Sequence, residues 1–406
     1  MIILYKIKGT LIRYKYLIVE FIINIFSFSL LIVSQQIFAL PIISRFYDAD
    51  QFGKIVIVFG ISNIITSMFG FSIGNARLLD GKFYNSIYLK MLYASNILIV
   101  LISFIIYNYF FSGSYIEGVT FSVICLLGSI RYFFLSEYRI RNTHNWIFRQ
   151  NFSYFLGILI GFLLFYFQRN WLIVFITAEV FSVGLCTYYF LKDGFFKSFK
   201  DNSSLKLSNT IQLTINNGAS YSLTQYDRFI IYPILGAVNV SLYYSASVSS
   251  KIGGLIMNPL SNFILGKLAN KKEESNNKVI NFVILGSLLV TVLYFILSII
   301  ATPILVKILY PGFFEKIKDV ILPICLGAAV MSGVNILKPI TMKYIGVKYY
   351  NKIFLVYGFI LIITSIILCI KYSLLGIAIA KVISSLVLLV CLLINLKRYS
   401  KGLRKV

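Results

Sequence analysis

Long apolar stretches alternate with short polar segments along the whole chain. A helix needs about 20 mostly apolar residues to cross the hydrocarbon core of a bilayer, and each of these stretches is about that long. We therefore predict an all-α, polytopic membrane protein with about 12 transmembrane helices. Their approximate ranges are 17–43, 54–76, 88–111, 117–138, 148–167, 171–191, 211–236, 240–266, 279–306, 320–342, 352–370 and 374–396.

The composition supports a membrane protein. Of the 406 residues, 59% are hydrophobic and only 13% are charged, whereas a soluble domain has about 25% charged residues. An ordinary cytosolic enzyme, a disordered chain and a disulfide scaffold are therefore excluded. The five cysteines lie in apolar stretches without a CxxC pair, and His144 is the single histidine. We predict no metal site, no cofactor and no enzymatic activity.

The basic residues indicate the orientation of the chain. It carries 38 Lys and Arg against 14 Asp and Glu, a net charge of +24. If the N-terminus is cytoplasmic, twenty-six basic residues fall in cytoplasmic segments and seven in outer ones. This asymmetry follows the positive-inside rule and predicts that both termini are cytoplasmic. The basic residues are dispersed among short connections, so we predict no nucleic-acid partner.

A weak internal repeat relates the two halves of the chain. Pro41 and Pro233 lie near the outer ends of the first and seventh predicted helices, 192 positions apart. Phe52 and Tyr244 are separated by the same offset, near the starts of the second and eighth helices. A repeat of six helices with conserved orientation predicts parallel halves, related by an axis along the membrane normal.

A polar connection near the middle of the chain separates these halves. It covers about 192–210 and is the longest cytoplasmic connection that we predict. We therefore expect two pseudo-symmetric six-helix bundles around a central cavity. The first covers 1–207 and includes the cytoplasmic N-terminus, and the second covers 208–406 and includes the cytoplasmic C-terminus.

Eight ionisable residues inside the predicted helices are candidates for intramembrane charges. A charge at that depth costs about 3 kcal/mol or more and by default marks a functional pathway. Five of the eight are basic, and this excess suits a phosphate-bearing ligand better than a cationic drug or sodium ion. The eight residues are Glu20, Arg131, Glu179, Asp227, Arg228, Lys251, Lys338 and Lys381.

Structural roles compete with functional ones at these positions. Glu20 and Lys338 lie near predicted cytoplasmic ends, and Arg131 is about two turns from one, where long side chains can reach the interface. Asp227 and Arg228 are adjacent and point about 100° apart on a helix. They form either an interhelical salt bridge or a cationic patch with an exchangeable proton.

Four kinds of motif resemble the Wzx-type polysaccharide flippases. This family belongs to the superfamily of multidrug exporters and lipid-linked peptidoglycan-precursor flippases. Two features depart from the patterns of these families. Tyr47 occupies a position where a glycine is common, and the twelve predicted helices are fewer than the fourteen of peptidoglycan-precursor flippases. The resembling segments are RFYDADQFG at 45–53, DRFIIYPILG at 227–236 with YSA at 244–246, LYPGF at 309–313 and YSLLGIAIA at 372–380.

The resemblance implies two six-helix bundles forming a V-shaped cavity in the bacterial plasma (inner) membrane. It implies transfer of an undecaprenyl-pyrophosphate-linked oligosaccharide from the inner to the outer leaflet by alternating access, driven by protons or by the membrane potential. Membrane lipids, a polysaccharide polymerase and chain-length proteins are the implied partners. The alternative is a multidrug or cation exporter of the same fold. A membrane polymerase or ligase is disfavoured because the outer connections are short and lack histidine.

We assign roles to the charged residues on this basis. Asp227 and Glu179 are the candidate proton-coupling residues. The candidate substrate-binding residues are Arg228, Lys251, Lys381, Arg131 and, in the first outer connection, Arg45.

Overall fold

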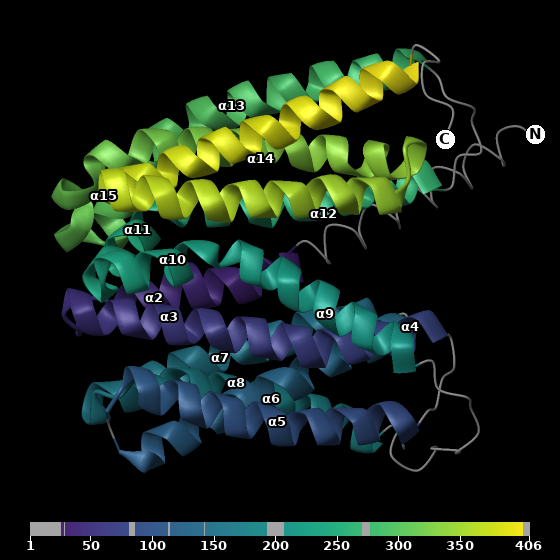
Figure 1. Cartoon of the computed structure of the whole chain (residues 1–406). Helices are drawn as coiled ribbons and strands as arrows, with labels where there is room; N and C mark the ends of the chain where they lie inside the picture. Colours follow the sequence, from purple (N-terminus) through teal and green to yellow (C-terminus); the bar gives the residue numbers. More distant parts are fainter. Residues whose placement is uncertain are drawn as a thin grey trace, which may run out of the picture. The chain divides into compact units, whose positions relative to one another are not determined.

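The computed structural model of the chain is built from long helices (Figure 1). It describes residues 26–27, 29–80, 86–112, 114–141, 143–192, 207–269 and 277–400, and these contain no β-strand. The chain forms two compact units. Unit 1 comprises Met1–Phe46 and Lys54–Gln225, and unit 2 comprises Tyr47–Gly53 and Tyr226–Val406.

Unit 1 is held together by an aromatic core. Phe134 stacks on Phe190 with ring centroids 4.6 Å apart, and Tyr138 stacks on the same ring at 5.2 Å. Such pairs add to the stabilisation from burial. The helices of this unit are η1 (Val33–Ala39), α2 (Leu40–Ile43), most of α3 (Ala49–Thr66), η2 (Ser67–Phe71), α4 (Ser72–Asp80), α5 (Ser86–Phe110), α6 (Tyr115–Ile140), α7 (His144–Gln168), α8 (Trp171–Lys192) and α9 (Leu207–Thr224).

Unit 2 ends in a helical hairpin. Tyr372 and Ser373 leave the helical conformation inside α15, and Ser373 has a φ of 52°. The arms on either side pack together, because Tyr349 donates to Asn395 at 3.0 Å. The helices of this unit are α10 (Tyr226–Leu235), α11 (Ala237–Ala246), α12 (Val248–Ala269), α13 (Asn277–Leu309), the short η4 (Pro311–Phe313), α14 (Phe314–Tyr344) and α15 (Val347–Ser400), with the first turn of α3.

The predicted all-α, polytopic membrane fold is confirmed. Eight of the described helices are long and apolar enough to span a membrane, and the longest, α15, contains the two spans predicted at 352–370 and 374–396. The described helices match the predicted ranges to within a few residues. The span predicted at 17–43 is described only from residue 26 onward, where Ser29–Ile43 is apolar and helical.

Two predicted spans are interrupted. The span at 211–236 bends at Gln225 between α9 and α10, and the span at 240–266 breaks at Ser247 between α11 and α12. Gly236 connects them with a φ of 84°, which a residue with a Cβ rarely adopts. In transporters, interrupted membrane helices commonly border the substrate or ion site, because their free backbone groups can bind polar ligands.

The compact units differ from the predicted lobes at helix α9 and at Tyr47–Gly53, which belongs to unit 2. Asn217 on α9 donates to the Ser72 hydroxyl on α4 at 2.8 Å, and Gly218 lies against Met68. These contacts place α9 in unit 1, although 208–406 was predicted as the second lobe. The boundary therefore follows the break at Gln225, and the division into lobes at 207/208 stays a prediction from the repeat.

Candidate functional site

The break after α9 places Arg228 in the interior of unit 2. Arg228 lies on the first turn of α10 and is only 4% exposed. Its neighbour Asp227 is half-buried, and the Asp227 carboxylate accepts a hydrogen bond from the Arg228 backbone N–H at 2.9 Å. The Asp227 carboxylate thus stabilises the backbone at the start of α10.

The Arg228 guanidinium lies over the ring of Tyr244, on α11. The distance from its Cζ to the ring centroid is 5.0 Å. A cation over an aromatic face is attracted by the negative charge of the π system, and more strongly where water is excluded. Tyr244 is 2% exposed. The ring therefore stabilises a guanidinium within the apolar interior.

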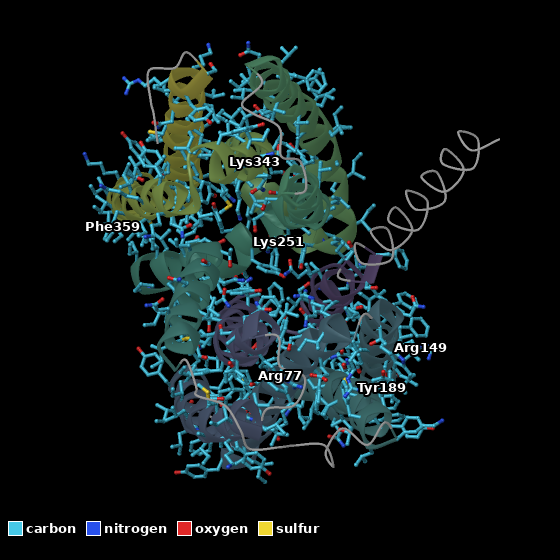
Figure 2. The ribbon with its side chains drawn as sticks, turned by 90° about the vertical axis from the view of Figure 1, so that its right-hand side faces the viewer. Arg77, Arg149, Tyr189, Lys251, Lys343 and Phe359 are labelled. Atoms are coloured by element: carbon cyan, nitrogen blue, oxygen red, sulfur yellow. The ribbon has the colours of Figure 1, made fainter. Side chains whose placement is uncertain are left out.

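The break at Ser247 brings Lys251, which is labelled in Figure 2, to the same tyrosine. The Lys251 ammonium donates to the Tyr244 carbonyl oxygen at 3.1 Å and lies 3.0 Å from the Tyr244 ring centroid. The last carbonyls of a helix lack backbone donors, and basic side chains commonly satisfy them. Lys251, one turn into α12, caps α11 in this way.

Lys381 and Asp227 complete this group of charges. The charges of Arg228, Asp227 and Lys381 all act on the Lys251 ammonium, and Asp227 also acts on Lys381. Lys381 lies on α15 against Gly327, where a Cβ would meet the Lys381 Cγ at 3.2 Å. Three bases and one carboxylate thus gather in unit 2, and we call Asp227, Arg228, Lys251 and Lys381 the cationic cluster.

An aromatic wall surrounds Tyr244. Its ring meets Phe52 edge to face at 6.1 Å and Tyr310 at 6.3 Å. Phe52 also stacks on Phe313 at 6.2 Å. Phe52 and Tyr244 are the two aromatics that the repeat relates, and here they touch. Gly53 permits this approach, since any Cβ there would collide with the Ala237 backbone.

Arg131 and Glu179 form a separate charged pair in unit 1. Arg131 donates from Nε to Glu179 Oε2 at 2.8 Å and from Nη2 to Oε1 at 3.0 Å. Arg131 is 2% and Glu179 4% exposed. Two parallel hydrogen bonds between a guanidinium and a carboxylate are among the stronger polar contacts in proteins. The pair joins α6 to α8.

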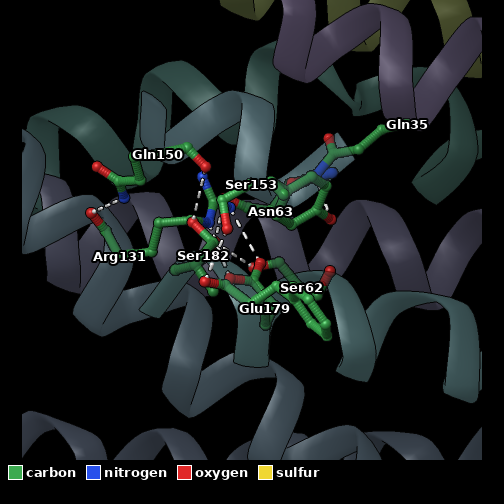
Figure 3. Close-up of polar contacts among 11 residues, drawn as sticks. Gln35, Ser62, Asn63, Arg131, Gln150, Ser153, Glu179 and Ser182 are labelled. Carbon is green, nitrogen blue, oxygen red and sulfur yellow. Dashed lines mark hydrogen bonds and ion pairs between the residues drawn. The ribbon is translucent and has the colours of Figure 1, made fainter. Parts of the chain in front are cut away.

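Amide and hydroxyl groups surround this pair (Figure 3). Gln150 donates to the Arg131 carbonyl at 3.2 Å, and Gln35 donates to Tyr154 at 2.9 Å. The Tyr154 ring lies 5.0 Å from the Arg131 Cζ. Four helical segments (η1, α6, α7 and α8) therefore meet at one buried polar network.

A second buried ion pair of unit 1 was missed by the sequence reasoning. Arg77 and Glu137 are paired at 2.7 Å with side chains 1% exposed, and Arg141 also bonds Glu137 at 2.9 Å. Arg77 and Arg141 were assigned to cytoplasmic connections, and Glu137 was not counted among the intramembrane charges. The one local signal was the spacing of Glu137 and Arg141, which face each other one turn apart.

The remaining candidates lie elsewhere. Arg45 is exposed in the turn between α2 and α3, and it is not part of either buried group. Lys338 is half-buried on α14, with its ammonium 5.9 Å from the Tyr350 ring centroid. Glu20 lies outside the described residues. Of the five predicted substrate-binding residues, the structure thus brings together Arg228, Lys251 and Lys381.

Solved structures of transporters have a similar arrangement of helices. The structure of the lipid II flippase MurJ, in an inward closed conformation, matches with a TM-score of 0.61 and 16% identity over 94% of this chain and 86% of that one. An inward-facing multidrug resistance transporter of the MATE family and MOP superfamily matches with a TM-score of 0.67 and 10% identity over 92% and 95%. The eukaryotic MATE transporter AtDTX14 matches with a TM-score of 0.60 and 13% identity over 94% and 95%.

The chain has the fold of these transporters. At such low identity the likeness concerns the fold alone. No family model matches the chain, and no curated protein sequence matches it significantly. The chemistry of its function therefore has to be argued from its own residues.

Proposed function

We propose that this protein is a flippase that moves an undecaprenyl-pyrophosphate-linked oligosaccharide from the inner to the outer leaflet of a bacterial plasma membrane. The observation that carries the proposal is the cationic cluster. In a membrane-spanning unit, the buried Arg228 and the half-buried Lys251 and Lys381 all interact electrostatically with one carboxylate or with each other, and a phosphate-bearing headgroup is the ligand that such an excess of bases favours.

The physical problem is to carry a polar headgroup across an apolar layer. The lipid tail can stay among the acyl chains, whereas the phosphates lose their water unless the protein replaces it. Arg228 offers planar donors and Lys251 and Lys381 offer compact positive charges. The interrupted helices around them supply further polar backbone groups. The fold shared with the lipid II flippase supports a lipid-linked substrate.

Of the two predicted proton-coupling residues, we favour Asp227. Glu179 accepts two hydrogen bonds from Arg131 in unit 1 and is not a member of the cationic cluster. Asp227 is half-buried beside three bases, and a proton there would change the charge that the phosphates meet. We propose that loading and release of the substrate alternate with protonation of Asp227.

The alternative function is export of cationic drugs, and the fold shared with MATE transporters favours it. A cationic substrate needs acidic residues to replace its water. In the described part of unit 2, the buried or half-buried charges beside Tyr244 include Arg228 and Lys251, and Asp227 is the one acid of the cationic cluster. This balance of charge favours the anionic substrate.

Reconstitution in vesicles separates these two functions. A fluorescent undecaprenyl-pyrophosphate glycan is placed in the inner leaflet, and its appearance outside is followed. Arg228→Gln and Lys251→Gln should each slow its transfer at least tenfold, whereas Arg149→Gln should leave transfer unchanged because Arg149 is exposed on α7. Transfer of a cationic dye without transfer of the glycan would favour the exporter.

A further inference from the structure

We propose that Tyr244 is a positioning residue that sets the preference of the cationic cluster for two adjacent phosphate groups. The proposal rests on the flippase function and adds to it a determinant of specificity. Tyr244 carries no charge, and its role follows from the way its ring and carbonyl hold two cations at one place.

The ring of Tyr244 interacts with both Arg228 and Lys251. The Arg228 Cζ lies 5.0 Å and the Lys251 Nζ 3.0 Å from the centroid of Tyr244. Two like charges so close to one point repel each other, and an aromatic face attracts both of them. Lys251 is held twice, because its ammonium also bonds the Tyr244 carbonyl at 3.1 Å. Without the ring, Lys251 would keep its bond to the carbonyl, but both cations would lose the aromatic face that attracts them to one place.

The ring is itself held in place. Phe52 and Tyr310 meet it edge to face, at interplanar angles of 77° and 89°. Tyr244 is 2% exposed, and Tyr310 1%. A buried ring flanked by two others has little freedom to turn, so the positions of both cations are defined before any ligand arrives. Such preorganisation increases affinity by lowering the ordering cost of binding.

The consequence for the ligand is a preference for diphosphate. A single phosphate group can neutralise one cation well and the other only partly. Two linked phosphate groups can place oxygens against both the guanidinium and the ammonium, with Lys381 as a further positive charge. Affinity for a diphosphate should therefore depend on the two cations being held together, and affinity for a monophosphate much less.

The test compares prenyl diphosphate with prenyl monophosphate binding to the purified full chain in detergent. Tyr244→Phe keeps the ring and should bind both lipids like the unsubstituted protein. Tyr244→Leu should lose about tenfold in diphosphate affinity and little in monophosphate affinity. Equal losses for both lipids, or an unchanged diphosphate affinity, would overturn the assignment.

A matched substitution separates positioning from packing. Tyr243→Leu removes a neighbouring ring that is also buried, at 1% exposed, and whose electrostatic contacts are with Tyr226, Asp227 and Tyr357. It should lower stability as Tyr244→Leu does, yet keep the preference for diphosphate. If Tyr243→Leu loses that preference equally, Tyr244 has no special role.

A second measurement needs no lipid. Acylation of Lys251 is quantified by mass spectrometry, and Tyr244→Leu should increase it severalfold while Tyr244→Phe leaves it unchanged. Should the unsubstituted protein bind neither lipid, the flippase proposal fails, but the labelling still decides whether Tyr244 holds Lys251. Equal labelling in all variants would refute the positioning role on its own.

Discussion

Arginine is tolerated inside this membrane protein because each buried guanidinium that we describe has a defined acceptor or aromatic surface. Arg131 has Glu179 and Arg77 has Glu137, whereas Arg228 lies over Tyr244. The Arg131–Glu179 pair is electrically balanced, and Glu137 is shared by Arg77 and the partly exposed Arg141, whereas Arg228 belongs to a group of three bases and one acid. This difference separates a structural role in unit 1 from a ligand-binding role in unit 2.

Breaking the Arg131–Glu179 pair should destabilise the protein strongly. Arg131→Met leaves the Glu179 carboxylate buried without its cation, and we expect a loss of about 3–5 kcal/mol in the free energy of unfolding. The double variant Arg131→Met/Glu179→Leu should recover most of this loss, because no unpaired charge remains. The measurement is unfolding of the purified protein in detergent.

Arg149→Met is the control for these variants. Arg149 is exposed and stacks on Trp146 at 4.7 Å, so its replacement should change stability little. The double variant is also compared with the single variants Arg131→Met and Glu179→Leu. If it loses as much free energy of unfolding as these two variants lose together, the ion pair is not the source of the effect.

The Arg77–Glu137–Arg141 group should behave differently from an exposed ion pair. Glu137→Gln leaves two guanidinium groups near an uncharged amide in a buried place, and should lower the unfolding midpoint markedly. Glu315→Gln breaks a pair with Lys318 of similar length, 2.6 Å, but the side chains are 75% and 56% exposed, and water screens such pairs. Thermal unfolding of both variants under identical conditions tests this, and similar midpoints would contradict it.

Sequence reasoning at this scale identified the residues but not their partners. Arg131 and Glu179 were both recognised as intramembrane charges, yet they lie 48 positions apart, and no local pattern links them. Arg77 was assigned to a connection because it follows the apolar run of 54–76, whereas α4 continues to Asp80 and buries it. Pairing depends on how helices pack, which one sequence read alone does not reveal.

Helices were the most predictable elements. Long apolar runs determine where a chain can cross a bilayer, and α5 to α8 begin and end within a few residues of the predicted ranges. The breaks at Gln225 and Ser247 were not predicted, because neither position carries a proline or glycine. Their cause is tertiary, since α9 packs in unit 1 and Lys251 caps the Tyr244 carbonyl.

The turn between α10 and α11 should require glycine. Gly236 has φ 84° and ψ 173°, a region that other residues scarcely occupy. Gly236→Ala should therefore lower the free energy of unfolding by about 1–3 kcal/mol. A steric clash does not contribute, because a Cβ at this position would meet no atom within 4 Å. The midpoint of thermal unfolding is the measurement.

Gly184→Ala provides the matched control. Gly184 also has open space around its Cα, but it lies inside helix α8. Alanine is favoured over glycine in a helix by about 1 kcal/mol, so this variant should be neutral or slightly more stable. Equal destabilisation by both substitutions would argue against backbone conformation as the cause.

At the scale of the whole molecule, the distribution of charge should determine the orientation. In unit 2, basic residues lie at the C-terminal ends of α14 and α15, at Lys343 in the last turn of α14 and at Lys397 and Arg398 in that of α15. The turn at Pro311–Phe313 comes directly before α14 and therefore lies at the other end of that helix. Lys and Arg are retained on the cytoplasmic side during insertion. The C-terminus should thus be cytoplasmic and the Pro311–Phe313 turn should face outward.

Reporter fusions in cells test this topology. Alkaline phosphatase folds only outside the cytoplasm, so it should be active when inserted at Gly312, which is exposed, and inactive when fused after Ser400. Green fluorescent protein should give the opposite result. The two sites are separated by α14 and the two arms of α15, an odd number of spans, so they must lie on opposite sides. Activity of alkaline phosphatase at both sites would mean that one of these helices does not cross the membrane, and activity only after Ser400 would mean that the charge asymmetry had been read in the wrong direction.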